Sequence, residues 1–88
     1  MHYNHKDVSM FDQSPISLIL TRAEALILED VCSRLADHPA SRFAHSAERY
    51  LLLSIATYIE NALPERFAPN YADLLHAAQQ TIQAEYEE

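Results

Sequence analysis

The segment from Tyr50 to Ile59 carries no charged side chain, although its apolar residues recur at the spacing of an α-helix. A helix on a protein surface normally places charged residues on the face that meets water, and a helix without them is generally buried on more than one side. Two arrangements satisfy this requirement. Either other helices of the same chain cover this helix at the centre of the fold, or a second subunit covers it.

The first helix is predicted over residues 22–37. It follows a capping box, Thr21-Arg22-Ala23-Glu24, in which the threonine hydroxyl accepts a hydrogen bond from the backbone N–H of Glu24 and the glutamate carboxylate accepts one from the backbone N–H of Thr21. Pro39 ends this helix, because proline disfavours helical geometry at the residue before it.

Two further helices are predicted downstream. The second is assigned to residues 42–63, because Pro64 blocks its continuation. The third covers residues 71–86 and has Asn70 as its N-cap. The linker between them is bracketed by prolines, and we expect it to form a tight turn with Phe67 directed inward.

Each helix has one apolar face that we expect to pack in the core. On the first helix Leu26 falls outside this face, among charged residues, so it is either an exposed apolar residue or a contact for another molecule. The predicted core faces consist of Ile27, Leu28, Val31, Cys32 and Leu35 on the first helix, of Leu51, Leu52, Ile55, Ile59, Ala62 and Leu63 on the second, and of Tyr71, Leu74, Leu75, Ala78, Ile82 and Tyr86 on the third.

The second helix has an opposite face on which charged side chains are also missing. A solvated face would carry lysine or glutamate there, and tyrosine supplies the polar-tipped apolar surface that is enriched at interfaces. We therefore expect this face, together with Leu26, to be a candidate interface. Its residues are Tyr50, Leu53, Ser54, Thr57, Asn61 and Leu26.

The N-terminal part of the chain is expected to be less regular. Residues 1–15 show no sustained periodicity and predict a flexible tail. Residues 16–20 are rich in strand formers but too few for a helix, so they are either a short strand or an extended arm. The expected fold is all-α: a single domain at residues 16–88, in which this arm precedes a three-helix bundle.

The length of the chain favours self-association. A chain of 88 residues buries only roughly 60–65% of the surface that it exposes when unfolded. Small folds usually compensate through disulfides, a metal or oligomerisation. The single cysteine, Cys32, excludes an intrachain disulfide, so we expect a homodimer.

The sequence also predicts a compartment. No apolar run approaches the roughly 20 residues that a bilayer requires, so no membrane partner is expected. The N-terminal residues lack the pattern of a secretory signal. The cytoplasm is therefore the expected compartment, and an unpaired cysteine agrees with it.

Charge and glycine content disfavour several functions. The formal net charge is −7 and the arginines are scattered, so a phosphate backbone would be repelled and nucleic acid is not an expected partner. Glycine is absent. Phosphate-binding loops and the nucleophile elbow of hydrolases need glycine for tight turns and close approach to a ligand, so those motifs are excluded.

The residues that could carry chemistry form no recognised constellation. The five histidines fit no metal-binding spacing, and the best local pair is His45 and Glu48, one helical turn apart if the second helix starts early enough. A structural hydrogen bond is the favoured interpretation of this pair. Cys32 lies on the predicted core face, where a thiol is inert. We therefore expect no catalytic residue, no metal and no cofactor.

The leading functional hypothesis is a non-enzymatic module for protein–protein interaction, acting as a homodimer that binds a further, unidentified protein. The alternative is a regulator linked to nucleic acid. The order of elements from Ile16 to Leu63 resembles that of ribbon-helix-helix dimers, which implies a transcriptional regulator whose strand reads DNA, although only Ser17 in the arm could contact a base. An acidic DNA mimic belongs to the same class. A third class, a small enzyme, depends on His45 and Glu48 alone.

Overall fold

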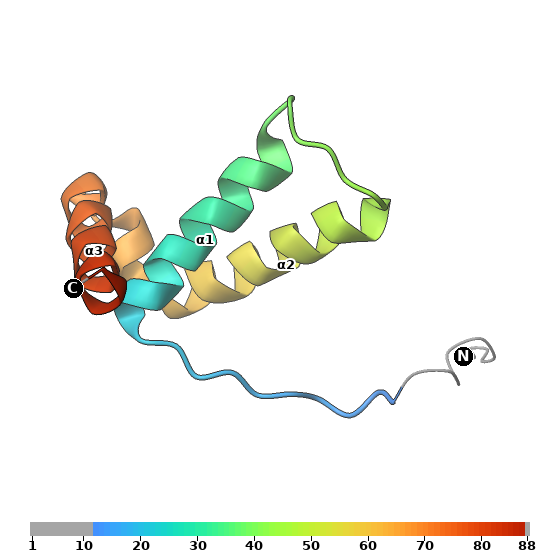
Figure 1. Ribbon diagram of the computed structural model, residues 1–88, viewed down its shortest axis with the longest axis horizontal. Helices are drawn as coiled ribbons and strands as arrows, with labels where there is room; N and C mark the ends of the chain where they lie inside the picture. The colour runs from blue at the N-terminus through green and yellow to red at the C-terminus, as the bar shows by residue number, and fades with distance from the viewer. Residues whose placement is uncertain (1–11, 88) are drawn as a thin grey trace.

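The computed structural model describes residues 12–87, and these residues form three α-helices and one short 3₁₀ helix. The elements are α1 (Arg22–Asp37), α2 (Ser46–Ala62), η2 (Pro64–Phe67) and α3 (Tyr71–Tyr86) (Figure 1). No strand occurs between residues 12 and 87. The prediction of an all-α fold is confirmed, whereas the tail predicted at residues 1–15 lies mostly outside the described residues.

The helix boundaries follow the local signals in the sequence. The capping box is present: Thr21 N donates to Glu24 Oε1 at 2.8 Å, and Glu24 N donates to Thr21 Oγ1 at 3.1 Å. The first and third helices have the predicted bounds. The second helix begins later than predicted, at Ser46, because His45 has extended backbone geometry and acts as its N-cap.

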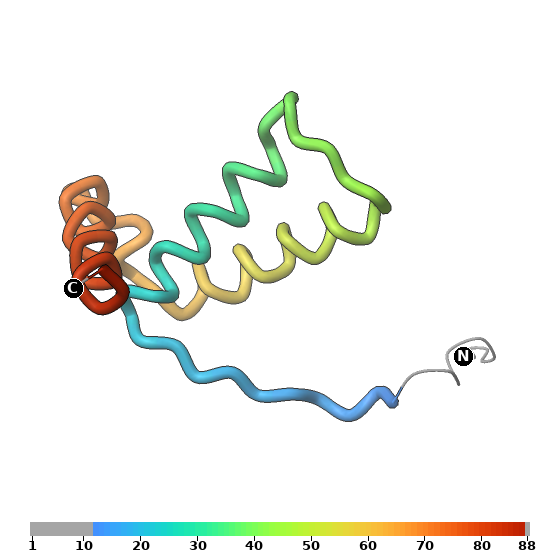
Figure 2. The backbone as a smooth tube through the Cα atoms, in the orientation of Figure 1, coloured from blue at the N-terminus to red at the C-terminus, as the bar shows by residue number. Residues whose placement is uncertain are grey.

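The central helix of the fold is α1. Both α2 and α3 pack mainly on α1, and η2 contacts α2 and α3. The two long helices α1 and α2 diverge from the end near α3 towards the loop that joins them, so that they form a V (Figure 2). Of the two alternatives for the uncharged helix, burial at the centre of the fold does not hold for residues 12–87, because much of the surface of α2 remains uncovered there.

The core is small. Leu26 of α1, Leu63 at the end of α2 and Ala78 of α3 form its main cluster. Partly buried residues of all three helices surround them. The other buried apolar residues of the described chain are Cys32, Ala36 and Ala56. Because four of these six residues are alanine or cysteine, the helices approach each other closely but bury little apolar surface.

Leu26 corrects the prediction for the first helix. It is only 5% exposed, so it is a core residue and not part of an interface. The buried residues of α1 recur at helical spacing through Glu29 to Ala36, and that face includes a carboxylate. The apolar pattern misplaced Leu26 because a charged residue lies on the side of α1 that packs inward.

Glu29 is the charged residue at the centre of this core, with only 1% of its surface exposed. Its Oε1 lies 3.0 Å from Arg66 Nε, and its Oε2 accepts a hydrogen bond from Ser33 Oγ at 3.0 Å. The Arg66 N–H is not aligned for a hydrogen bond to Oε1, so their attraction is that of an ion pair. The Arg66 guanidinium also lies over the ring of Tyr71, 5.0 Å from its centroid.

The turn that supplies Arg66 differs from the expected one. Residues 64–67 form η2, which begins at Pro64 as proline at a first helical position favours. Arg66 faces Glu29, whereas Phe67 is exposed. The inward aromatic residue that we expected is therefore replaced by an inward cation, because the buried carboxylate requires a partner.

The exposure of the apolar residues differs most from the core faces predicted by helical periodicity on α2. Leu63 is buried as predicted, and Leu52, Ile55 and Ile59 are partly buried, but Leu51 and Ala62 are exposed. On α3 the predicted stripe is buried or partly buried, except for Tyr86. The V-shaped arrangement accounts for the difference, since α2 has only one helical neighbour along most of its length.

Replacing Leu26 with alanine should lower the free energy of unfolding by about 2–5 kcal/mol, because it opens a cavity among Leu63 and Ala78. The matched control is Leu51→Ala, which truncates an exposed leucine and should cost less than about 1 kcal/mol. Urea unfolding followed by circular dichroism measures both. Equal losses for the two variants would contradict the core described above.

Candidate functional site

His45 and Glu48 stabilise the start of α2 through hydrogen bonds to the backbone and not through the hydrogen bond within the pair that we expected. His45 Nδ1 accepts a hydrogen bond from Ala47 N at 3.0 Å. Glu48 Oε1 accepts one from Ala44 N at 2.9 Å. Both side chains are exposed. The pair would lie one turn apart within the helix only if the helix started earlier, but it begins after His45, so each side chain satisfies a backbone N–H at the helix end.

The potential metal ligands are dispersed. Between residues 12 and 87, no group of three or more histidine, cysteine, aspartate or glutamate side chains is placed to hold a metal ion. His38 Nδ1 accepts a hydrogen bond from Ala40 N at 2.9 Å, in the loop after α1. His2 and His5 lie outside the described residues.

The uncharged face of α2 is open to solvent. We call Tyr50, Leu53, Ser54, Thr57 and Asn61 the α2 face. Tyr50 is 62% exposed, Leu53 is partly buried and the other three residues are exposed. A shallow groove of about 240 Å³ is lined by Leu53, Ser54, Thr57 and Tyr58. The alternative that another helix of the chain covers this face does not hold for the described residues.

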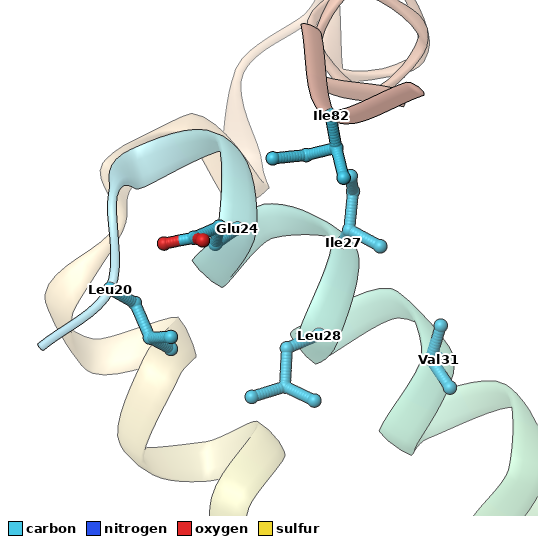
Figure 3. Close-up of a pocket in the computed structure, with 6 residues that line it drawn as sticks. All are labelled: Leu20, Glu24, Ile27, Leu28, Val31 and Ile82. Carbon is cyan, nitrogen blue, oxygen red and sulfur yellow. The ribbon is translucent and has the colours of Figure 1, made fainter. Parts of the chain in front are cut away.

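A second uncovered surface lies on α1. Ile27, Leu28 and Val31, which the sequence pattern assigns to the core, are only partly buried, and Leu35 is exposed. With Ile82 of α3 and with Leu20 and Glu24, the first three line a groove of about 300 Å³ (Figure 3). Ile27 and Ile82 approach each other in this view, while Leu20 and Leu28 point into the space beside α1. We call this the α1 groove.

The α1 groove continues into a neighbouring one through Leu20. The second groove, of about 280 Å³, lies between the segment before α1 and the end of α2. It is lined by Leu18, Leu20, Thr21, Arg22, Ala25, Tyr58, Ile59, Ala62 and Leu63. The two grooves share Leu20. We call these two neighbouring and mainly apolar grooves the open face; their polar lining residues are Thr21, Arg22 and Glu24.

The segment of residues 16–20, which we call the arm, has no regular secondary structure and extends away from the helices (Figure 1). Ile16 is 95%, Leu18 76% and Ile19 93% exposed. No charged residue occurs between Asp12 and Arg22. The arm therefore exposes apolar side chains beside the open face, which Leu18 and Leu20 of the same arm help to line.

The open face was not predicted from the sequence, because the apolar pattern assigns Ile27, Leu28 and Val31 of α1 to the core. The high content of apolar residues in a chain of this length could have indicated that some apolar surface stays exposed. Three short helices cannot enclose all the apolar stripes that this chain carries, and one stripe had to remain outside.

An exposed ion pair fixes η2 at the start of α1. Arg22 donates two hydrogen bonds to Glu65, from Nε at 2.6 Å and from Nη2 at 2.8 Å. The hydrogen bond from Arg22 lowers the pKa of the Glu65 carboxyl to about 2. This pair complements the buried contact of Arg66 with Glu29, so the two central residues of η2 are both bound to α1.

Comparison of the chain with protein-family models, with curated proteins and with solved structures finds no match. Among residues 12–87, none of the helices has the length and apolar content needed to cross a membrane.

The Arg22–Glu65 pair should make stability depend on pH in the acid range. The folded-state pKa of Glu65 lies below its ordinary value, so the contribution is complete above about pH 4.5 and is lost as the pH falls towards 2. Glu65→Gln should therefore lower the urea midpoint at pH 7, and its difference from the wild type should shrink below pH 4. A difference that stays constant down to pH 2.5 would show that the pair does not titrate in this way.

Cys32 should react slowly with thiol reagents. Its side chain is buried, and burial, followed by the nearby Glu29 carboxylate, raises the pKa of its thiol. Less thiolate and less access both slow the reaction. Labelling of the native protein should be at least about 100-fold slower than labelling in urea, as measured by mass spectrometry. Comparable rates would reveal a reactive thiol instead.

Proposed function

We propose that this protein is a non-enzymatic module for protein–protein interaction that acts as a homodimer. The partly exposed apolar stripe of α1, Ile27, Leu28 and Val31, which lines the α1 groove, is the observation that carries the proposal. Large exposed apolar patches mark interaction sites, and the exposed side chains of Ile16, Leu18 and Ile19 add apolar surface beside this groove. The open face supports self-association because no other part of residues 12–87 covers it.

The energetic scale favours association. Burying an isoleucine or leucine side chain contributes about 1.5–3 kcal/mol. Two copies present six exposed arm side chains of this type, from Ile16, Leu18 and Ile19 in each. Their burial would contribute about 9–18 kcal/mol, of the same order as the roughly 4–15 kcal/mol that association costs in lost freedom. The matching surface of the grooves adds to the favourable side.

The α2 face supports a different role, the binding of a further protein. It combines an exposed tyrosine with hydroxyl and amide groups and contains no charge. Tyrosine is enriched among the residues that contribute most to interface affinity. The acidic chain attracts positively charged proteins over a distance. We therefore propose that the partner has a basic surface around an uncharged contact patch.

Direct reading of DNA has less support. The arm would have to enter a groove of DNA, but its exposed side chains are apolar and the net charge of −7 repels phosphate. An acidic mimic that occupies a DNA-binding protein is compatible with the proposed basic partner. In that case DNA should compete with the module for the partner.

Tyr50→Glu should abolish capture of the partner without changing the mass of the homodimer, because the charge lies on the α2 face. The experiment is affinity capture from the native host, with quantitative mass spectrometry and light scattering of the purified protein. Gln79→Glu, an equal change at an exposed residue of α3, is the control. A partner retained equally by wild type and by Tyr50→Glu would rule out the α2 face.

A further inference from the structure

One side of α2 carries a row of uncharged, mainly apolar residues that the described chain does not cover. They follow one another at intervals of four, three and four positions, and we call them the α2 seam: Leu51, Ile55, Tyr58 and Ala62. Leu51 is 59% and Tyr58 74% exposed, Ala62 is exposed and Ile55 is partly buried. Side chains at such intervals pack between the side chains of a facing helix. The seam therefore has the spacing of a surface that receives another helix.

The α2 seam lies on a different side of the helix from the α2 face. At 100° per residue the seam spans about 60°, and its centre is about 110° away from the centre of the α2 face. Tyr58 borders the shallow grooves on both sides of the helix, whereas Ala62 lines only the one next to the arm. The seam thus continues the open face along α2, on the side where the homodimer is proposed.

The groove at the Ala62 end of the seam has room for a large apolar side chain. Its volume is about 280 Å³, and it lies between the arm and the end of α2. Ala62 contributes only a methyl group to its wall, and Leu18 on the arm is 76% exposed. An apolar cavity of about 150 Å³ already holds a molecule the size of benzene. A leucine side chain from another molecule therefore fits beside Ala62.

From these observations we propose that two copies pack through their α2 seams, with the two helices antiparallel about a two-fold axis between Ile55 and Tyr58. This inference rests on the homodimer proposed above and names the contact that forms it. In this register Leu51 of each copy enters the groove beside Ala62 of the other. Ile55 of each copy lies against Tyr58 of the other. Each large side chain of the seam thus meets a different residue, and both copies make the same contacts, as a two-fold interface requires.

Size and charge both favour the antiparallel arrangement over a parallel one. A parallel pair would place Leu51 on Leu51 and Ala62 on Ala62, so the grooves beside Ala62 would stay empty. It would also bring together the two copies of Glu48, an exposed acid three positions before the seam. In the antiparallel pair Glu48 approaches the other end of the seam, where Arg22 holds Glu65. There it meets a cation as well as an anion.

The area of this contact is that of a reversible dimer. Burying Tyr58, Leu51 and Leu18 in the proportions that they expose removes roughly 200–350 Å² of surface in each copy. The smaller residues of the seam and its flanks contribute a comparable area, so two copies bury about 800–1,200 Å². Interfaces of this size belong to weak and transient complexes. The dissociation constant is therefore expected in the micromolar range.

The first test is the mass of the full chain in solution, measured by analytical ultracentrifugation between about 1 and 500 μM. The wild type should pass from the 10.0 kDa chain to twice that mass. Tyr58→Glu should weaken the dimer at least about tenfold, because it places a carboxylate in an apolar contact. Tyr50→Glu is the matched control. It makes the same change in the same helix but on the α2 face, and should alter the dissociation constant less than about threefold.

The outcomes of this test separate the seam from the homodimer. A wild type that stays monomeric up to the highest concentration would overturn both. A dimer that Tyr58→Glu leaves intact, or that both substitutions weaken equally, would overturn the seam alone. Both tyrosines are more than half exposed in one chain, so neither change disturbs the core, and circular dichroism verifies this.

The second test is a disulfide that only the antiparallel register allows. In a chain carrying both Leu51→Cys and Ala62→Cys, mild oxidation should link residue 51 of one copy to residue 62 of the other. These positions are about 16 Å apart along one helix, too far for a disulfide within a chain. The native Cys32 is buried and does not compete.

Leu51→Cys alone is the control for this cross-link. The antiparallel register keeps the two copies of residue 51 about 16 Å apart along the helices, so this variant should cross-link at least about tenfold more slowly. Equal rates for the single and double variants would show a parallel or random encounter and would overturn the proposed contact.

Discussion

The ion pair between Glu29 and Arg66 determines which side of α1 becomes the inside of this protein. A carboxylate with 1% exposure is tolerated only where a cation lies beside it, and η2 places Arg66 at 3.0 Å. With Glu29 inside, Leu26 and Ala36 are inside too, since they lie on the same face of the helix. The apolar stripe formed by Ile27, Leu28 and Val31 then lies at the edge of the core and remains partly exposed. We infer that the pair selects this orientation more than it adds stability, because desolvation offsets most of its attraction.

The sequence predicted the helices more accurately than their packing, and the reason is physical. Capping boxes and prolines act within a few residues, so the bounds of α1 and α3 could be derived from Thr21, Glu24 and Pro39 and from the linker before Tyr71. The orientation of α1 depends on Arg66, more than thirty positions beyond Glu29, and no periodicity within one helix contains that information. For the same reason the pattern placed Leu26 on the surface and Val31 in the core.

The candidate sites could be anticipated only in part. The absence of charge identified the α2 face, which the structure leaves open, because charge depletion is visible in a single helix. The α1 groove could not be predicted in this way, because it forms only when the fold brings Leu20 and Ile82 beside Ile27. For His45 and Glu48 the spacing in the sequence suggested a polar pair, whereas each side chain accepts a hydrogen bond from a backbone N–H at the start of α2.

The electrostatics of the chain limit how its surfaces can be used. Two copies that each carry a net charge of −7 repel each other, so an attraction between them has to come from apolar burial and not from charge. The open face and the arm meet this condition, because neither contains an unpaired charged side chain: Glu24 is held by the cap and Arg22 by Glu65. A partner with a basic surface is instead attracted by the net negative charge of this chain. The acidic composition thus favours apolar contact between identical chains and electrostatic attraction towards a different protein, which is the division of roles proposed for the open face and the α2 face.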